Sequence, residues 1–278
     1  MRTVAASEIM RAVRDLAIAV NRNLPEDVLK ALRRALEVEE SPVGRSVLLK
    51  LIENAEIART EQMPICQDTG LAVVFVEVGQ EVQVEGNLTF AINEGVRQGY
   101  GKGYLRSSAA DPISRQNTGD NTPAIIHYEL APGDKIRVAF LAKGGGSENM
   151  SAMFMLKPSQ GLSGIKKAVV DTVDKAGANP CPPVIVGVGI GGTFELAAVN
   201  AKRALLRPLG SPNLDPELAE LEKEWLAEVN KLGIGPAGFG GRVTALGVHL
   251  LKAPCHIASL PVVVNLQCHA SRHGEVVI

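Results

Sequence analysis

The sequence predicts an α+β fold in which N-terminal helices precede a mixed sheet with flanking helices. Two observations predict it: apolar residues recur at helical spacing through residues 1–62, and from residue 63 onward short β-branched runs alternate with helical patterns. We therefore expect one domain over residues 1–278, helical in 1–62 and mixed in 63–278. With 278 residues, 46% of them hydrophobic, the chain can bury a sizeable core.

Three helices are expected first. Ile9, Val13 and Val20 recur at helical spacing, and Ser41-Pro42 offers an N-cap residue followed by a proline at the first helical position. The expected ranges are 3–22, 25–39 and 42–60.

The later part of the chain mixes strands and helices. The β-branched run 71–79 predicts a strand, and the alternating segments 125–130 and 135–142 around Ala131-Pro132-Gly133-Asp134 predict a β-hairpin. Further helices are expected at 89–100, 147–157, 161–177, 193–206 and 215–231. Further strands are expected at 183–192, 242–251 and 257–268.

Composition excludes several classes of protein. A net charge of -1 and an aromatic content of 4% argue against nucleic-acid binding. No apolar run approaches the roughly 18 residues that span a bilayer, and the N-terminus lacks the apolar stretch of a signal peptide, so we expect a cytoplasmic protein without membrane contact. Four cysteines are too few for a disulfide scaffold of this length, which leaves thiols, metal ligands or nucleophiles.

The cysteines lie where strands begin or end. Ile65–Gly70 (ICQDTG) precedes a strand, Asn179–Pro183 (NPCPP) holds Cys181 among prolines, and Gln267–His273 (QCHASRH) follows a strand. The structural alternatives are an Asx-type turn with a buried cysteine, an incidental connector and a frayed polar tail. Dispersed spacing excludes a zinc knuckle, whereas three thiolates assembled by the fold could hold an iron–sulfur cluster with one open, Lewis-acidic iron.

Other motifs contain glycine, arginine or histidine. His256, beside Cys255, precedes Cys268 by twelve residues, and a hairpin could place His256 near Cys268. Gly187–Gly192 (GVGIGG) matches a dinucleotide-binding pattern but lacks an obvious βαβ context. The remaining candidates are an anion-binding triple glycine in KGGGSEN (143–149), a carboxylate-binding arginine in YLRSS (104–108) and a polar site wall at 115–122.

Together these segments resemble the class I, iron–sulfur-dependent fumarate hydratases and the related tartrate dehydratases. The resemblance is carried by ICQDTG, YLRSS, NTGDNTP (117–123), KGGGSEN, NPCPP, GVGIGG and VVVNLQCHASRH (262–273). It implies a [4Fe-4S] cluster held by Cys66, Cys181 and Cys268, with Cys255 as a spare thiol. It also implies catalytic roles for Asp68 and His256, and a substrate pocket lined by Gln67, Arg106 and Gly145.

The resemblance also implies a partner chain. Single-chain members continue into a second domain that supplies further arginines, a lysine and the threonine proposed as the base, whereas this sequence stops ten residues after Cys268. We therefore expect an α subunit whose site is completed by a separate β subunit, in an α2β2 oligomer. The implied reaction is reversible hydration of fumarate to malate. The Asp68–His256 pair would handle the proton of water, Arg106 would hold a carboxylate, and the Gly145 amide would add a donor.

Three alternatives remain open at this point. A tartrate dehydratase α subunit would share the cluster and the leaving hydroxyl. A non-catalytic iron–sulfur regulatory subunit would bind the cluster without turnover. A dinucleotide-binding protein would rest on residues 187–192 alone.

Overall fold

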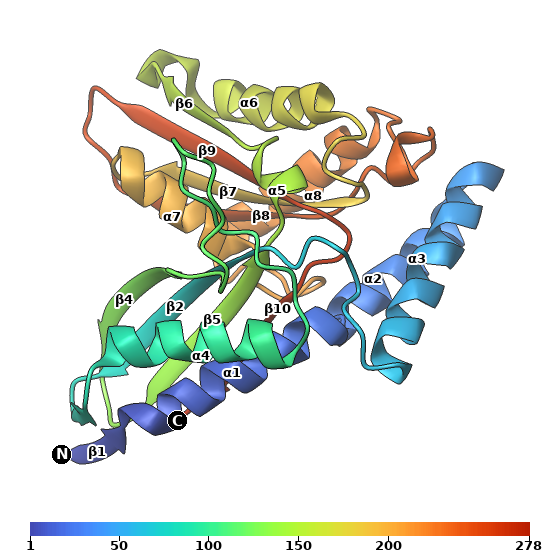
Figure 1. Ribbon diagram of the computed structural model, residues 1–278. Helices are drawn as coiled ribbons and strands as arrows, with labels where there is room; N and C mark the ends of the chain where they lie inside the picture. The colour runs from blue at the N-terminus through green and yellow to red at the C-terminus, as the bar shows by residue number, and fades with distance from the viewer. The chain divides into compact units, whose positions relative to one another are not determined.

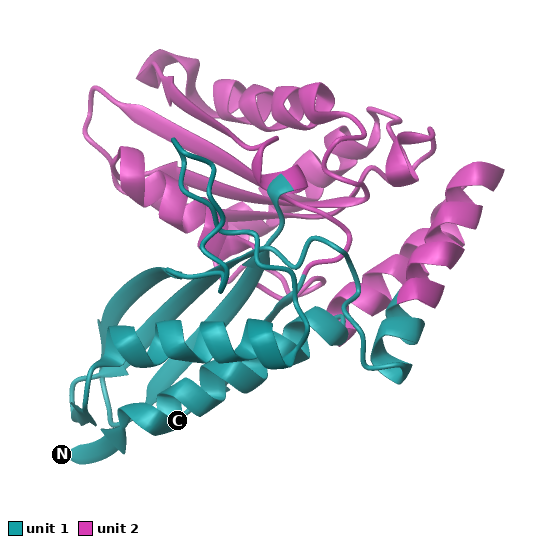
Figure 2. Cartoon of the chain, viewed as in Figure 1, with its two compact units in different colours: residues 1–25, 55–145, 272–278 teal, residues 26–54, 146–271 magenta.

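The computed structural model describes residues 1–278, which divide into two compact units (Figure 2). The first comprises Met1–Pro25, Ala55–Gly145 and Arg272–Ile278, and the second comprises Glu26–Asn54 and Gly146–Ser271. The helical first sixty residues are thus shared between the units. The single domain expected from the sequence stays a prediction, whereas the α+β class is confirmed.

The helices follow the predicted order closely (Figure 1). None of them combines the length and apolar character needed to cross a bilayer. The elements of the first unit are β1 (Arg2–Ala5), α1 (Ala6–Arg22), β2 (Leu71–Gly79), β3 (Val82–Glu85), α4 (Leu88–Lys102), β4 (Ile125–Ala131), β5 (Ile136–Lys143) and β10 (His273–Val277). Those of the second are α2 (Glu26–Val38), α5 (Gly145–Glu148, beginning at the unit boundary), β6 (Ala152–Leu156), α6 (Gly161–Ala176), β7 (Val184–Gly191), α7 (Phe194–Ala204), α8 (Pro216–Asn230), β8 (Ala245–Ala253) and β9 (Leu260–Gln267). Helix α3 (Pro42–Thr60) runs from the second unit into the first.

The first unit packs α1 and α4 against a four-stranded sheet of order β10-β5-β2-β4. Its core joins apolar side chains of both helices to inward-facing residues of β2 and β5. The two helices approach closely because glycines of α4 face α1: a Cβ at Gly95 would lie 2.7 Å from the carbonyl oxygen of Met10. Strands β1 and β3 form a separate parallel pair.

The hairpin predicted over 125–142 is wrong. Strand β2 lies between β4 and β5, pairing in parallel with β4 and antiparallel with β5. The connection between β4 and β5 passes over the end of β2, where Gly79 N donates to Lys135 O at 2.9 Å and Gln80 N donates to Ala131 O at 2.8 Å. The predicted turn at 131–134 does connect β4 to β5, but these two strands are not neighbours, because β2 lies between them.

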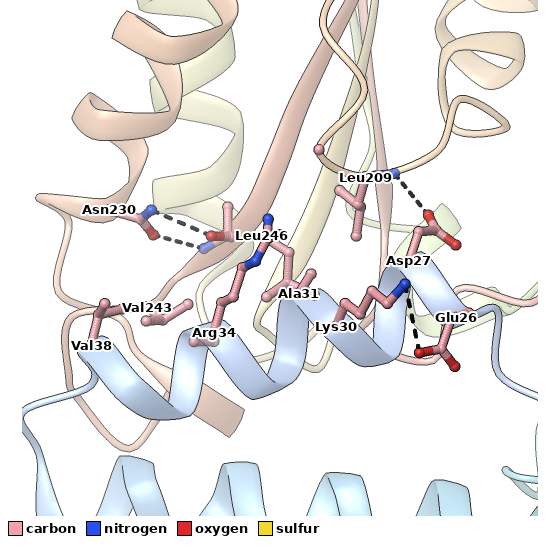
Figure 3. Close-up of a pocket in the computed structure, with 13 residues that line it drawn as sticks. Glu26, Asp27, Lys30, Ala31, Arg34, Val38, Leu209, Asn230, Val243 and Leu246 are labelled. Atoms are coloured by element: carbon pink, nitrogen blue, oxygen red, sulfur yellow. Dashed lines mark hydrogen bonds and ion pairs between the residues drawn. The ribbon is translucent and has the colours of Figure 1, made fainter.

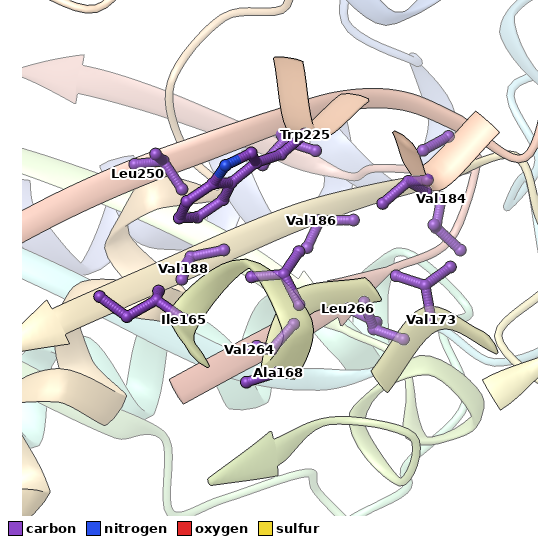
Figure 4. Close-up of a cluster of buried hydrophobic side chains, with 14 of the residues drawn as sticks. Ile165, Ala168, Val173, Val184, Val186, Val188, Trp225, Leu250, Val264 and Leu266 are labelled. Atoms are coloured by element: carbon purple, nitrogen blue, oxygen red, sulfur yellow. The ribbon is translucent and has the colours of Figure 1, made fainter. Parts of the chain in front are cut away.

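The second unit is a three-layer body around a sheet of order β6-β9-β7-β8. Helices α6 and α8 cover one face, and their core includes the fully buried Trp225 with Val186, Val264 and Leu250 (Figure 4). Helix α7 covers the other face, where Ala197 and Ala201 pack with Val263. Alternate residues of β9 therefore belong to opposite layers.

One further expectation is wrong, and one structural alternative is excluded. The helix predicted over 147–157 is wrong, because only Gly145–Glu148 is helical and residues 152–156 form β6, paired antiparallel with β9. Phe154 and Leu156 pack toward α6 while Met153 packs toward α7, a period of two that five residues display weakly. The polar C-terminal tail is not frayed, since β10 pairs with β5.

Candidate functional site

Residues 65–70 form a loop that leads into β2 and is pinned at both ends. Ile65 N donates to the carbonyl of Asn21 at 2.9 Å. At the other end Gly70 has a φ of +74°, and a Cβ there would lie 2.7 Å from the backbone of Lys143. Because only glycine tolerates both conditions, the sequence dictates where the loop turns into the strand.

The carboxylate of Asp68 is fixed by two backbone amides. Oδ1 accepts from Gly70 N at 3.0 Å, which is the Asx-type turn considered from the sequence, and Oδ2 accepts from Gly145 N at 2.8 Å. The guanidinium of Arg272, which is 1% exposed, donates to the Asp68 carbonyl. Asp68 is therefore oriented, and the Gly145 amide is directed at Asp68 rather than held open as a donor.

Buried groups hold the backbone beside Asp68. The Tyr100 hydroxyl donates to the carbonyls of Thr69 and Gly70 at 2.8 and 2.9 Å, and burial raises its pKa, so it stays a donor. Asn121 Nδ2 also donates to Gly70 O, at 3.1 Å. Thr69 Oγ1 donates to the carbonyl of Arg106 at 2.9 Å, which ties the Arg106 segment to the loop.

Arg106 stands on this framework with its side chain exposed and without a hydrogen bond or ion pair in the chain. The segment around it is rigid, because Asn121 Oδ1 accepts from Ser108 N and Ala109 N, and Ser107 bonds to Asn117. The polar run at 115–122 thus mostly bonds to its own loop. The exposed guanidinium is the kind of group that binds a carboxylate.

The N-terminal end of β7 and the C-terminal end of β9 meet at one edge of the second sheet, because these strands are antiparallel. Cys181 precedes β7 and Cys268 follows β9. The carbonyl of Cys181 accepts from His269 Nδ1 at 3.0 Å and from His269 N at 3.4 Å. Two of the predicted ligand segments are thereby held together, with Cys181 exposed and Cys268 half-buried.

The structure separates His256 from that edge. His256 lies in the turn between β8 and β9, exposed, with its Nδ1 accepting from Ala258 N at 3.1 Å. The whole of β9 lies between this turn and Cys268, and β7 lies between β8 and β9. The hairpin expected to bring His256 near Cys268 is therefore wrong.

The chain was compared with known proteins. Residues 10–277 match the family described as Fumarate hydratase (Fumerase). The chain belongs to this family. It is 44% identical over 258 residues to the putative L(+)-tartrate dehydratase subunit alpha of Methanocaldococcus jannaschii, covering 90% of each chain. It is 32% identical over 278 residues to the L(+)-tartrate dehydratase subunit alpha of Escherichia coli O157:H7, covering 99% of this chain and 92% of the relative.

The chain belongs to a hydro-lyase family, so the predicted cluster ligands can be compared with the cysteines of this structure. None of the four is in a disulfide. Neither unit by itself gathers three His, Cys, Asp or Glu side chains that could hold a metal ion. Cys66 belongs to the first unit and Cys181 and Cys268 to the second, so the predicted set draws on both. Three thiols at strand ends have the chemistry of iron–sulfur ligands, and in this respect the residues fit the group.

The glycine run 187–192 has a packing role in this family member. Strands β7 and β8 pair in parallel with α7 and α8 between them, so a βαβ context exists after all. However, a Cβ at Gly187 would lie 2.2 Å from Ala201 O, and one at Gly189 would lie 2.0 Å from Ala197 O. These two glycines let α7 lie close on the sheet instead of forming a phosphate loop.

A separate pocket of about 490 Å³ lies in the second unit between α2 and the start of β8. Lys30 and Arg34 line it together with Leu209, Val243 and Leu246, and Asp27 accepts from Leu209 N at 2.7 Å (Figure 3). None of the predicted site residues lines this pocket. Arg272, Asn121 and His269 lie in predicted motifs, but their contacts with Asp68, Gly70 and Cys181 were missed because these partners lie far away in the sequence.

Proposed function

We propose that the chain is the α subunit of an iron–sulfur hydro-lyase that adds water reversibly to fumarate to give malate. The observation that carries the proposal is the fixed Asp68 carboxylate, which two backbone amides orient on a loop tied to the Arg106 segment. The oriented carboxylate and the exposed, unpaired arginine lie on two segments joined by the Thr69–Arg106 hydrogen bond, and these groups suit proton transfer to, and ion pairing with, a dicarboxylate.

The cofactor of this proposal is a [4Fe-4S] cluster held by Cys66, Cys181 and Cys268. When bound, such a group would supply a Lewis acid for the substrate hydroxyl. The free-thiol chemistry at Cys66 and the contact of His269 with the Cys181 carbonyl support the assignment. The spare thiol, Cys255, donates to the Ser259 carbonyl at 3.2 Å in the turn before β9 and has no part in the set.

In this proposal, residues of the chain have separate roles in the elimination of water from malate. The C–OH bond of malate breaks, and Asp68, in its carboxylic acid form, gives the leaving hydroxide a proton, so that water departs and the Asp68 carboxylate remains. A base removes a proton from the adjacent carbon, and the electrons of that C–H bond form the C=C bond. Arg106 holds one substrate carboxylate as an ion pair, and Gln67, next to Asp68, offers an amide to the same substrate.

The base and the remaining carboxylate contacts come from a separate β subunit in this proposal, in an α2β2 assembly. The names of the relatives as alpha subunits support it. Co-purification of the chain with its β partner, followed by mass measurement of the complex, tests this part.

Tartrate is the second candidate substrate, because the relatives are named tartrate dehydratases. The deciding experiment loads the α–β complex with iron and sulfide and assays fumarate, malate and L-tartrate in parallel. Higher kcat/KM on tartrate would replace fumarate in the proposal, and inactivity on all three would favour a regulatory subunit. Cys181→Ser, Cys66→Ser and Cys268→Ser should each lose the visible absorbance of the cluster, whereas Cys255→Ser should keep it.

A further inference from the structure

Gln267 is a buried amide with nothing to bond to. It is the last residue of β9, directly before Cys268, and its side chain is 0% exposed. Neither Nε2 nor Oε1 has a hydrogen-bond partner in the chain. A buried N–H without a partner is rare in native proteins, because its hydrogen bond to water has been lost and not replaced.

The position of the amide follows from the register of the sheet. Gln267 lies opposite Ile185 on β7, four residues after Cys181. Val262, Val264 and Leu266 face the α6–α8 core, so Val263, Asn265 and Gln267 belong to the opposite face. Gln267 therefore lies at the same edge of the sheet as the Cys181 and Cys268 segments.

On the same face, the side-chain donor of Asn265 has a partner, although its Oδ1 has none. Asn265 Nδ2 donates to Glu148 Oε2 at 2.9 Å, and Glu148 in turn pairs with Lys202. The Asn265 donor has a carboxylate acceptor, whereas the Gln267 donor, two residues further along β9, has none. An apolar side chain would fill the same position without this cost.

We propose that the acceptor for Gln267 Nε2 is a sulfur atom of the iron–sulfur group, either an inorganic sulfide or a cysteine thiolate. The inference rests on the proposed function. It assigns Gln267 as a positioning residue that stabilises the group and shifts its reduction potential. Hydrogen bonds to cluster sulfurs stabilise the more negative, reduced form, and such outer partners affect metal affinity.

The test compares Gln267→Met with the unchanged chain, both as the metal-free full chain and after loading with iron and sulfide. In the metal-free chain the variant should have an equal or higher Tm, because an unpartnered amide has been replaced by an apolar group of similar length. In the loaded chain a chelator should bleach the visible band about 10–100-fold faster. The midpoint potential, followed by electron paramagnetic resonance, should become more negative.

A matched control on the same strand face is Val263→Ala, at a position 6% exposed and packed on α7. It should lower the Tm of both forms and leave the bleaching rate and potential unchanged. This separates a weakened β9 from a lost hydrogen bond to the group.

Two results would overturn the inference. If Gln267→Met lowers the Tm of the metal-free chain, the amide has a structural partner such as a buried water. If bleaching rate and potential match those of the unchanged chain, the amide does not reach the group. Failure of the unchanged chain to take up iron and sulfide at all would reject the proposed function itself.

Discussion

Gly145 and Asp68, which lie on either side of the whole segment from β2 to β5, are joined by a hydrogen bond of 2.8 Å from the Gly145 amide to Asp68 Oδ2. The triple glycine that looked like an anion-binding loop thus binds an anion of its own chain. The neighbouring Gly144 has less room for a side chain than Gly145: a Cβ at Gly144 would be 3.1 Å from Asp68 Oδ2 and 3.3 Å from Arg272 Nη2, whereas one at Gly145 would be 3.9 Å from Asp68 Oδ2. The backbone conformation of the glycine run therefore helps to determine where the Asp68 carboxylate lies.

Gly144→Ala should therefore reduce activity through Asp68. The added methyl group displaces the carboxylate by a few tenths of an ångström, and we expect kcat of the loaded α–β complex to fall about ten- to a hundredfold. Gly146→Ala is the control, since its Cβ would have its nearest neighbour at 3.6 Å and should leave kcat unchanged. Equal activity in the two variants would contradict a role for the Asp68 position.

Arg272→Met should destabilise the chain although it keeps the length of the side chain. The guanidinium is 1% exposed and donates to the Asp68 carbonyl and, at 3.3 Å, to Asn21 Oδ1. Leaving buried acceptors without a donor costs about 1–3 kcal/mol each. Urea unfolding measures the loss, and Arg137→Met, at an ion-paired position 46% exposed, should lose less than about 1 kcal/mol. Similar losses in both would mean that burial of Arg272 is not the cause.

Gly187→Ala should be among the most destabilising single changes in the second unit. The new Cβ would lie 2.2 Å from Ala201 O, so α7 must move away from the sheet, at a cost of about 1–3 kcal/mol or more. Gly101→Ala, in α4 with open space around it, should instead stabilise the chain by about 0.5–1 kcal/mol. Thermal unfolding distinguishes them, and an unchanged Tm for Gly187→Ala would contradict the packing role of this glycine.

Local patterns predicted the helices well and the strand order poorly. The bounds of α2 and α3 match the expected ranges within a residue, because caps and helical periodicity are encoded within a few residues. The pairing of β4 with β2 depends instead on contacts between distant segments, which the turn at 131–134 does not specify.

The same contrast applies to the candidate site. Asp68 and Cys181 were singled out by their neighbours in the sequence. Arg272 could not be assigned to Asp68, because only the pairing of β10 with β5 brings it there. Gln267 read as one more residue of an apolar strand, and its unpartnered amide became visible only when burial was known.

His249 should make stability depend on pH. It is 4% exposed, and burial, helped by the nearby charge of Arg207, lowers its pKa to about 4. In the unfolded chain the histidine has its ordinary pKa of 6.5, so the unfolded state takes up more protons than the folded state between the two pKa values. Stability is then fully present above about pH 6.5 and falls by about 3 kcal/mol as the pH drops toward 4.

The variant His249→Asn isolates this contribution, because an amide can still donate to the Ala204 carbonyl, which lies 3.1 Å from His249 Nδ1. Urea unfolding at pH 7 and pH 4.5 measures the difference in free energy of unfolding between the unchanged chain and the variant. This difference should shrink or reverse at the lower pH. A constant difference for His249→Asn would show that its imidazole is not the group responsible.

His256 is expected to act at the site of a second copy of the chain. The extended strand β9, Leu260–Gln267, separates its turn from Cys268 by about 23 Å at the usual rise per residue. Asp68→Asn and His256→Asn should each inactivate the α2β2 complex. Co-expression of the two variants should restore about a quarter of the activity, since half of the random dimers carry one intact composite site. Doubly tagged complexes that contain both variants and remain inactive would exclude sharing between copies, and full activity of His256→Asn alone would remove this histidine from the reaction.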